Sequence, residues 1–151
     1  AVLKEVPGAE LWIAGGGDLE PDLRVLAAEM GVKGSVRFHG VVSEEEKQNL
    51  LRQASCLTLP SRGEGFGLVY LEAMRYGKPC LVSNCDAGRE VVNPPEAGLA
   101  VDPSKADELI ESLVSLLTRS EEWGLSARRR YEAHFTAAAF QQRLLTALAE
   151  I

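Results

Sequence analysis

The stretch SRGEGFGLVYLEAM, residues 61–74, places two glutamates, Glu64 and Glu72, around a Gly-Phe-Gly turn. An apolar run closed by Pro60 comes before it, and a helical pattern comes after it. Because glycine adopts backbone conformations closed to other residues, this arrangement predicts a strand, a tight turn and a helix that starts near Gly67. At about 100° per residue, the two carboxylates would point within about 80° of each other. The stretch therefore indicates one βα unit with two acidic groups at its turn.

Outward from this stretch, short apolar runs alternate with helical patterns. The runs predict strands at Leu11–Ala14, Val36–Phe38, Cys56–Leu59, Pro79–Val82 and Gly98–Val101. The patterns predict helices at about Pro21–Met30, Ser43–Ala54 and Gly67–Tyr76, and then three helices with Ser104, Ser120 and Thr136 as N-caps. Runs that are almost continuously apolar are typical of parallel strands covered on both faces. We expect a single α/β domain over residues 1–151, with a doubly wound, parallel, Rossmann-like sheet and C-terminal helices.

Composition excludes several classes of protein. A net charge of −6 argues against a general nucleic-acid binder, since phosphate neutralisation needs a basic surface. No apolar run approaches the roughly 20 residues that span a bilayer, and AVLKEVPGAE lacks the pattern of a signal peptide, so a cytoplasmic protein is expected. The three cysteines form no CxxC pair, and His39 and His134 stand alone. No metal site is therefore expected.

Ligands of such sheets bind beyond the carboxyl ends of the strands. The loops that leave these ends are Gly15–Asp18, Ser61–Gly67 and Ser83–Glu90. Gly15 and Gly17 partly match the dinucleotide-binding fingerprint, but Glu20 stands where the third glycine belongs. A tight turn close to a ligand is therefore favoured over a nicotinamide or flavin site.

The start of the helix near Gly67 suits an anion. Its first turn offers unpaired N–H groups and the positive end of the helix dipole, and Gly63, Gly65 and Gly67 leave room for a phosphate or diphosphate. No Gly-Lys-Ser/Thr follows, so the loop is not a P-loop. The glutamates could accept hydrogen bonds from sugar hydroxyls, one from a ribose and the other from a hexose. Alternatively, Glu64 complements the helix dipole and Glu72 is a solvated helix residue.

Together these segments resemble a known family. Pro60-Ser61, Glu64–Leu68, Leu71–Met74 and Gly77–Pro79 are similar to the donor-binding signature of the group 1 (family 4) retaining glycosyltransferases of the GT-B fold. Similar to further elements of that family are Leu11–Gly17, Phe38–Val41, Ala87-Gly88 with Glu90–Val92, and Gly98–Val101. The resemblance covers nearly the whole chain.

The resemblance implies a nucleoside-diphosphate sugar as donor, with no bound cofactor and no metal. It assigns the ribose hydroxyls to Glu72, and to Glu64 the sugar hydroxyls and a catalytic place beside the anomeric carbon. It assigns the diphosphate and sugar to the amides of Phe66, Gly67 and Leu68. Gly65, Gly15 and Gly17 complete the expected donor-binding set.

The chain also departs from the family. GT-B enzymes have two domains, and this chain matches only the second, so the N-terminal acceptor domain is a missing partner. The family's first strand and its basic residues also have no counterpart. We therefore expect Leu11–Ala14 to pair directly with Cys56–Leu59, or another chain to fill the gap by self-association. The fragment alone is expected to bind nucleotide weakly and to transfer no sugar. In the full-length enzyme Arg128–Arg130 could contact a membrane peripherally, although a solvated face is the simpler interpretation.

Two other functions remain open. One is another GT-B enzyme, such as a nucleotide-sugar epimerase or a phosphorylase, although no lysine suited to the phosphorylase cofactor is found. The other is a non-catalytic nucleotide-binding α/β module, which would bind free nucleotide regardless of the sugar.

Overall fold

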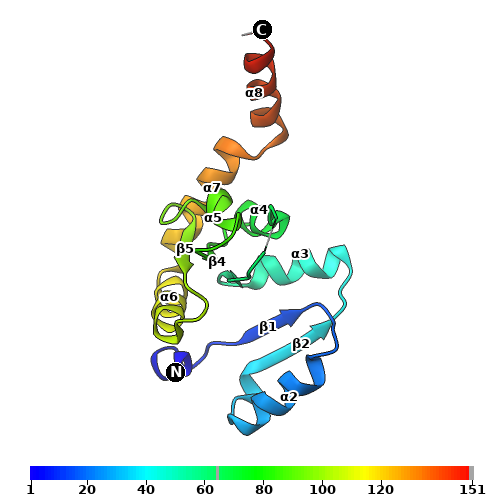
Figure 1. Ribbon diagram of the computed structural model, residues 1–151, viewed down its shortest axis with the longest axis vertical. Helices are drawn as coiled ribbons and strands as arrows, with labels where there is room; N and C mark the ends of the chain where they lie inside the picture. Colours follow the sequence, from blue (N-terminus) through cyan, green and yellow to red (C-terminus); the bar gives the residue numbers. More distant parts are fainter. Residues whose placement is uncertain (64, 150–151) are drawn as a thin grey trace. The chain divides into compact units, whose positions relative to one another are not determined.

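The computed structural model describes residues 1–63 and 65–149 (Figure 1). The chain forms two compact units, an N-terminal unit of residues 1–50 and a C-terminal unit of residues 51–151. The expectation of a single domain over residues 1–151 stays a prediction.

The N-terminal unit is a parallel strand pair with its crossover helix. Its elements are α1 (Val2–Glu5), β1 (Leu11–Ala14), α2 (Glu20–Glu29), the 3-10 turn η1 (Lys33–Ser35), β2 (Val36–Gly40) and the start of α3 (Glu44–Gln53). β1 and β2 run parallel, with Leu11 opposite Val36 and an irregularity between Ile13 and Ala14. α2 connects the two strands, as the pattern of residues 21–30 predicts (Figure 1).

The start of α3 follows the sequence signal closely. The Ser43 hydroxyl accepts a hydrogen bond from the Glu46 N–H at 3.2 Å, and the Glu46 carboxylate accepts one from the Ser43 N–H at 2.8 Å. This reciprocal pair is the capping box expected from Ser43 and Glu46. α3 then continues across the boundary between the two units.

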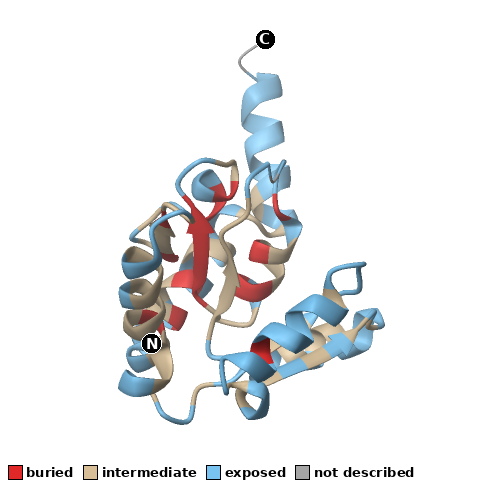
Figure 2. Ribbon diagram, turned by 60° about the horizontal axis from the view of Figure 1, so that its bottom comes forward, coloured by how far each residue is buried: buried red, intermediate tan, exposed pale blue. Residues whose placement is uncertain are grey.

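The C-terminal unit is a parallel sheet with helices on both faces. Its elements are β3 (Leu57–Leu59), α4 (Leu68–Arg75), β4 (Cys80–Ser83), α5 (Gly88–Val92), β5 (Gly98–Val101), α6 (Ala106–Thr118), α7 (Ser120–His134) and α8 (Ala137–Ala149). The strand order is β3-β4-β5, with Leu57 opposite Cys80 and Cys80 opposite Gly98. Every residue of β4 is buried (Figure 2).

The core of this unit has two parts on opposite faces of the sheet. Cys80 and Val82 pack with Tyr70 and Met74 of α4 and with residues of α5 and α7. Leu81, between them in sequence, packs instead with β5 and α6. Since successive strand residues point to opposite faces, helices cover both sides of β4. The parallel α/β class with doubly covered strands is confirmed here.

Two glycines allow close backbone approaches in this core. A Cβ at Gly98, where φ is +151°, would lie 1.9 Å from the Cys80 carbonyl oxygen. A Cβ at Gly124 in α7 would lie 2.3 Å from the Gly77 carbonyl oxygen. β5 and α7 can therefore reach their packed positions only because neither residue carries a side chain.

Of the three predicted N-caps of the C-terminal helices, one is confirmed and two are wrong. Thr136 caps α8, since its hydroxyl accepts from the Ala139 N–H at 3.2 Å. Ser104 is not a cap, because Asp102 takes both its N–H and its hydroxyl, and Lys105 is the N-cap of α6. Ser120 is the first residue of α7 rather than its cap, since Arg119 alone separates α6 from α7.

The expected pairing of Leu11–Ala14 with Cys56–Leu59 would join strands of the two units, and it stays a prediction. Among the described residues, the sheet of the N-terminal unit is β1-β2 and that of the C-terminal unit is β3-β4-β5. Within its own unit, β1 pairs with β2, and β3 pairs with β4. The alternative, that another chain pairs with these strands, also stays a prediction.

Candidate functional site

The loop of residues 60–67 leads from β3 into α4. Gly67 is the N-cap of α4, is buried, and has the left-handed φ of +75°. Its carbonyl accepts a hydrogen bond from the Tyr70 N–H at 2.9 Å, which closes the first turn. Among the described residues no side chain caps α4. The first N–H groups of this eight-residue helix therefore remain available to an anion.

Glu72 lies one turn into α4 from this helix start. It is four positions after Leu68, so both lie on the same side of the helix. The Glu72 side chain is half-buried, and one of its carboxylate oxygens is shielded from solvent. Phe66 and Leu68 are both exposed. Glu72 therefore lies on the same side of α4 as Leu68, the residue that directly follows the glycine turn.

Gly65, Phe66, Gly67, Leu68 and Glu72 thus come together at the start of α4. Their roles in donor binding stay predictions. Glu64, the expected catalytic residue, lies outside the described residues.

Gly15 and Gly17 lie in the N-terminal unit, in the exposed turn that follows β1. Gly15 has a φ of +126°, and its N–H donates to the Gly40 carbonyl at 2.7 Å. The tight turn expected here is therefore present, and it is tied to the end of β2. Any part of these glycines in donor binding stays a prediction.

Asp86, which no motif in the sequence marks, connects the loop after β4 with Ser61 in the loop after β3. The Ser61 hydroxyl donates to Asp86 Oδ2 at 3.1 Å, across 25 residues of sequence. Asp86 Oδ1 accepts from the Gly88 N–H at 3.0 Å and so supports the first turn of α5. Both side chains are half-buried. A single carboxylate therefore joins two of the predicted ligand loops.

Tyr70 also connects the end of β3 with the start of α5. It is fully buried, and its hydroxyl donates to the Leu59 carbonyl at the end of β3 at 2.7 Å. Its ring lies against Gly88, where an added Cβ would be 2.4 Å from Tyr70 Cε2. The first turn of α4, the end of β3 and the start of α5 are thus packed into one junction.

The basic triplet at 128–130 has a structural role that the sequence did not reveal. Arg130, whose side chain is only 12% exposed, donates to the carbonyls of Val91 and Glu90 at 2.7 and 3.0 Å. It also pairs with Glu96 at 2.8 Å. Arg130 therefore holds the last turn of α5 against α7. Arg128 donates to the Arg75 carbonyl and pairs with Glu132, whereas Arg129 is exposed.

Burial also sets the chemistry of the cysteines. Burial raises the pKa of the Cys56 thiol to about 11, and it raises the pKa of the fully buried Cys80 thiol as well. Neither thiol is therefore a ready nucleophile at neutral pH. Cys85 is exposed, and its N–H donates to the Ser83 hydroxyl at 3.1 Å. Across residues 1–63 and 65–149, no group of three His, Cys, Asp or Glu side chains is placed to hold a metal ion.

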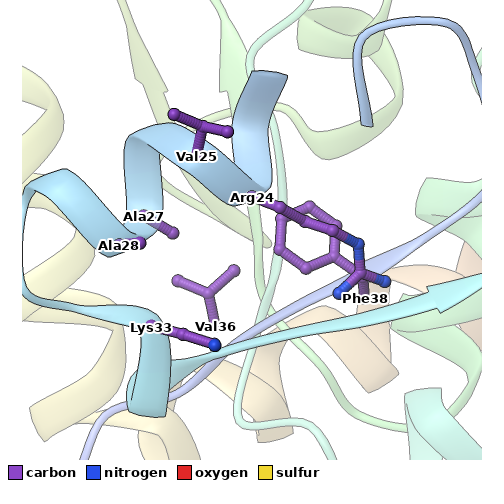
Figure 3. A pocket seen from close by; sticks show the side chains of 7 residues that line it. All are labelled: Arg24, Val25, Ala27, Ala28, Lys33, Val36 and Phe38. Atoms are coloured by element: carbon purple, nitrogen blue, oxygen red, sulfur yellow. The ribbon is translucent and has the colours of Figure 1, made fainter. Parts of the chain in front are cut away.

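A cavity of about 390 Å³ lies elsewhere, between α2 and β2 of the N-terminal unit (Figure 3). The Arg24 guanidinium lies 4.4 Å from the centre of the Phe38 ring at one side of it. Val25, Ala27, Ala28, Lys33 and Val36 complete the lining. None of the predicted donor-binding residues that the structure describes lines this cavity. In addition, no helix in the described part of the chain is both long and apolar enough to cross a membrane.

Comparison with known proteins gives a consistent result. The family of group 1 glycosyl transferases matches residues 1–133. The D-rhamnosyltransferase WbpZ of Pseudomonas aeruginosa is 36% identical over 131 residues, which is 83% of this chain and 34% of that protein. A GDP-mannose-dependent monoacylated alpha-(1-6)-phosphatidylinositol monomannoside mannosyltransferase of Corynebacterium glutamicum is 33% identical over 157 residues, 97% of this chain and 40% of that protein. The chain thus spans little more than a third of these relatives.

Solved structures agree on the fold. Sucrose-phosphate synthase of Thermosynechococcus elongatus superposes with a TM-score of 0.79 at 28% identity, over 98% of this chain and 40% of that one. Anabaena HepE, solved in complex with UDP, superposes with a TM-score of 0.80 at 19% identity, over 99% of this chain and 44% of that one. At that identity the second likeness supports the fold alone.

Proposed function

The chain belongs to the group 1 glycosyl transferases, and on that premise we propose that residues 60–72 bind the donor of a retaining glycosyl transfer. The donor is a nucleoside-diphosphate sugar. The observation that carries the proposal is the start of α4, where a left-handed glycine precedes a helix that no described side chain caps. The names of the relatives support a nucleotide-sugar, since one is described as GDP-mannose-dependent.

Each part of this donor has a partner in the proposal. The first N–H groups of α4, with the helix dipole behind them, take the diphosphate and stabilise the charge that builds up on it as the glycosidic bond breaks. Glu72, on the same side of the helix, accepts hydrogen bonds from vicinal ribose hydroxyls. Glu64 lies outside the described residues, and the family resemblance assigns to it the sugar hydroxyls and the place beside the anomeric carbon. No metal is required, because helix amides carry the phosphate charge.

The full-length enzyme provides the test. Titration calorimetry with GDP, UDP, GDP-mannose and UDP-glucose identifies the donor. We expect one nucleotide-sugar to bind and to be turned over, with retained anomeric configuration by NMR. Binding of free nucleotide with no contribution from the sugar, and no transfer, would favour the non-catalytic module instead.

Glu72→Gln separates the ribose assignment from general effects of charge. Loss of the carboxylate removes a charge-assisted hydrogen bond of about 1.5–3 kcal/mol, so donor affinity should fall roughly 10- to 100-fold. Glu111→Gln on α6 is the matched control, since Glu111 is exposed on another helix. Equal affinities of the two variants would contradict the assignment.

The chain of 151 residues offers a second test. We expect it to bind nucleotide weakly and to transfer no sugar, because the relatives that it matches are more than twice as long. Donor turnover by the purified chain would refute this part of the proposal.

A further inference from the structure

The loop that carries the predicted donor site is rich in glycine. Gly63, Gly65 and Gly67 stand at alternate positions, and a glycine has more backbone freedom to lose on ordering than any other residue. A loop of this kind binds an anion well only if its position is fixed beforehand, because otherwise binding must supply the ordering free energy.

Described contacts fix this loop at both ends. At its end, Tyr70 ties the first turn of α4 to the Leu59 carbonyl. At its beginning, Ser61 donates its hydroxyl to Asp86 Oδ2, while Asp86 Oδ1 accepts from the Gly88 N–H. Each oxygen of the Asp86 carboxylate thus has one partner, on two different loops.

From this arrangement, and resting on the proposed function, we infer that Asp86 is a positioning residue for the donor site. It acts through Ser61, and it holds the glycine loop against the start of α5. Its removal releases the Ser61 side chain from the start of α5, while the Ser61 N–H stays on the Leu59 carbonyl at 2.9 Å and α4 stays tied through Tyr70. Donor affinity therefore falls, whereas the chemistry of the bound donor changes little.

A second Asp–Ser pair in the same unit provides a matched control. Asp102 Oδ1 accepts from the Ser104 hydroxyl at 2.7 Å and from its N–H at 3.0 Å. Ser104 is two positions after Asp102, so these two hydrogen bonds stabilise their own turn. They lower the pKa of the Asp102 carboxyl, and the charge of Arg62 in the glycine loop lowers that pKa further. Ser104→Ala removes the same kind of hydrogen bond as Ser61→Ala without releasing the glycine loop.

Asparagine at position 86 distinguishes positioning from charge. Its carbonyl oxygen can still accept from the Gly88 N–H, and its amide can donate to the Ser61 hydroxyl oxygen. Asp86→Asn therefore keeps the connection and removes the negative charge. If Asp86 acted mainly by repelling a diphosphate, this variant would bind the donor more tightly than wild type.

The experiment uses the full-length enzyme with GDP-mannose or UDP-glucose, whichever is turned over. We expect Asp86→Ala and Ser61→Ala to raise KM for the donor about 5- to 10-fold, with kcat within about twofold of wild type. Asp86→Asn and Ser104→Ala should stay within about twofold in both constants. Unchanged KM in both alanine variants, or a donor affinity raised by Asp86→Asn, overturns the inference.

Hydrogen exchange of the amides of residues 61–68, followed by mass spectrometry, gives a readout independent of activity. We expect exchange about tenfold faster in Asp86→Ala than in wild type, with Ser104→Ala unchanged. If the wild-type enzyme turns over no nucleotide-sugar, the proposed function fails and exchange alone decides the inference. Faster exchange in Asp86→Ala then supports the role of Asp86, and equal exchange overturns it.

Discussion

The two units of the chain build parallel sheets of similar local design but very different burial. In the C-terminal unit, all four residues of β4 are buried, with helices packed on both faces. In the N-terminal unit, all of which the structure describes, Ala27 is the only buried apolar residue. Because burial of apolar surface is the main favourable term in folding, stability should be concentrated in the C-terminal unit.

The contrast is clearest on α2. Leu19, Leu23, Leu26 and Met30 recur at the spacing of one helix face, yet all four are exposed. A unit of about 50 residues buries less than about 60% of its unfolded surface and is marginal by itself. In the C-terminal unit, described residues cover α4 and α6, whereas the apolar residues Phe140, Leu144, Leu145 and Leu148 of α8 are exposed like those of α2.

The largest effect is expected from Gly98→Ala. The new Cβ would lie 1.9 Å from the Cys80 carbonyl oxygen, at a φ of +151°, so strands β4 and β5 would have to separate. We expect a loss of more than about 4 kcal/mol in the free energy of unfolding, measured by urea denaturation. Gly8→Ala, with nothing within 4 Å of its Cβ, is the control and should cost little. A stable Gly98→Ala protein would show that the C-terminal unit is not closely packed at this point.

Arg130→Ala should rank next. It removes three described hydrogen bonds to α5 and to Glu96, and leaves the Val91 and Glu90 carbonyls without that donor. We expect a loss of about 2–3 kcal/mol in the free energy of unfolding. Arg129→Ala, the exposed neighbour, should cost less than about 0.5 kcal/mol. Equal losses in the two variants would contradict a structural role for Arg130 and favour a solvated basic face at residues 128–130.

Two valine truncations compare the units directly. Val82→Ala in β4 removes fully buried methyl groups and should cost about 2 kcal/mol, whereas Val36→Ala in β2 should cost less than about 1 kcal/mol. Val36 is half-buried and already lines a cavity, so little packing is lost there. Urea denaturation of both variants measures the difference. A larger cost at Val36 than at Val82 would reverse the comparison.

The smallest expected effect is on the pH dependence of stability. Burial raises the pKa of Cys56 to about 11 in the folded chain, above the value of about 8.5 for an unfolded thiol. This stabilisation is complete below the unfolded pKa and is lost as pH rises toward the folded pKa. We expect about 1 kcal/mol to be lost between pH 8 and 9.5 through this thiol. Cys56→Ala should reduce the slope, and an unchanged slope would contradict the burial of Cys56.

Local signals predicted much of this structure. The five strand runs, the capping box at Ser43 and the glycine turn before α4 all depend on residues a few positions apart, and all three are found. Ser104 shows the limit of such signals. Its hydroxyl could cap a helix, but the carboxylate of Asp102 two residues earlier competes for it and prevails.

The local sequence patterns did not predict the long-range contacts. Nothing in Arg128–Arg130 indicates that one of the three arginines reaches carbonyls 39 and 40 residues away. Asp86 and Ser61 each look like ordinary loop residues, and only the fold brings them within 3.1 Å. Their part in the candidate site therefore depends on the register of β3 and β4, which no local pattern encodes.

The contact between Tyr70 and Gly88 bears on how this sequence can diverge. A methyl group at position 88 would overlap the tyrosine ring, so neither residue is free to change alone in that direction. Homologues with alanine at position 88 should carry a smaller side chain at position 70, and they should then lack the hydroxyl that reaches the end of β3. Covariation between these two positions across the family would be the evolutionary trace of this junction.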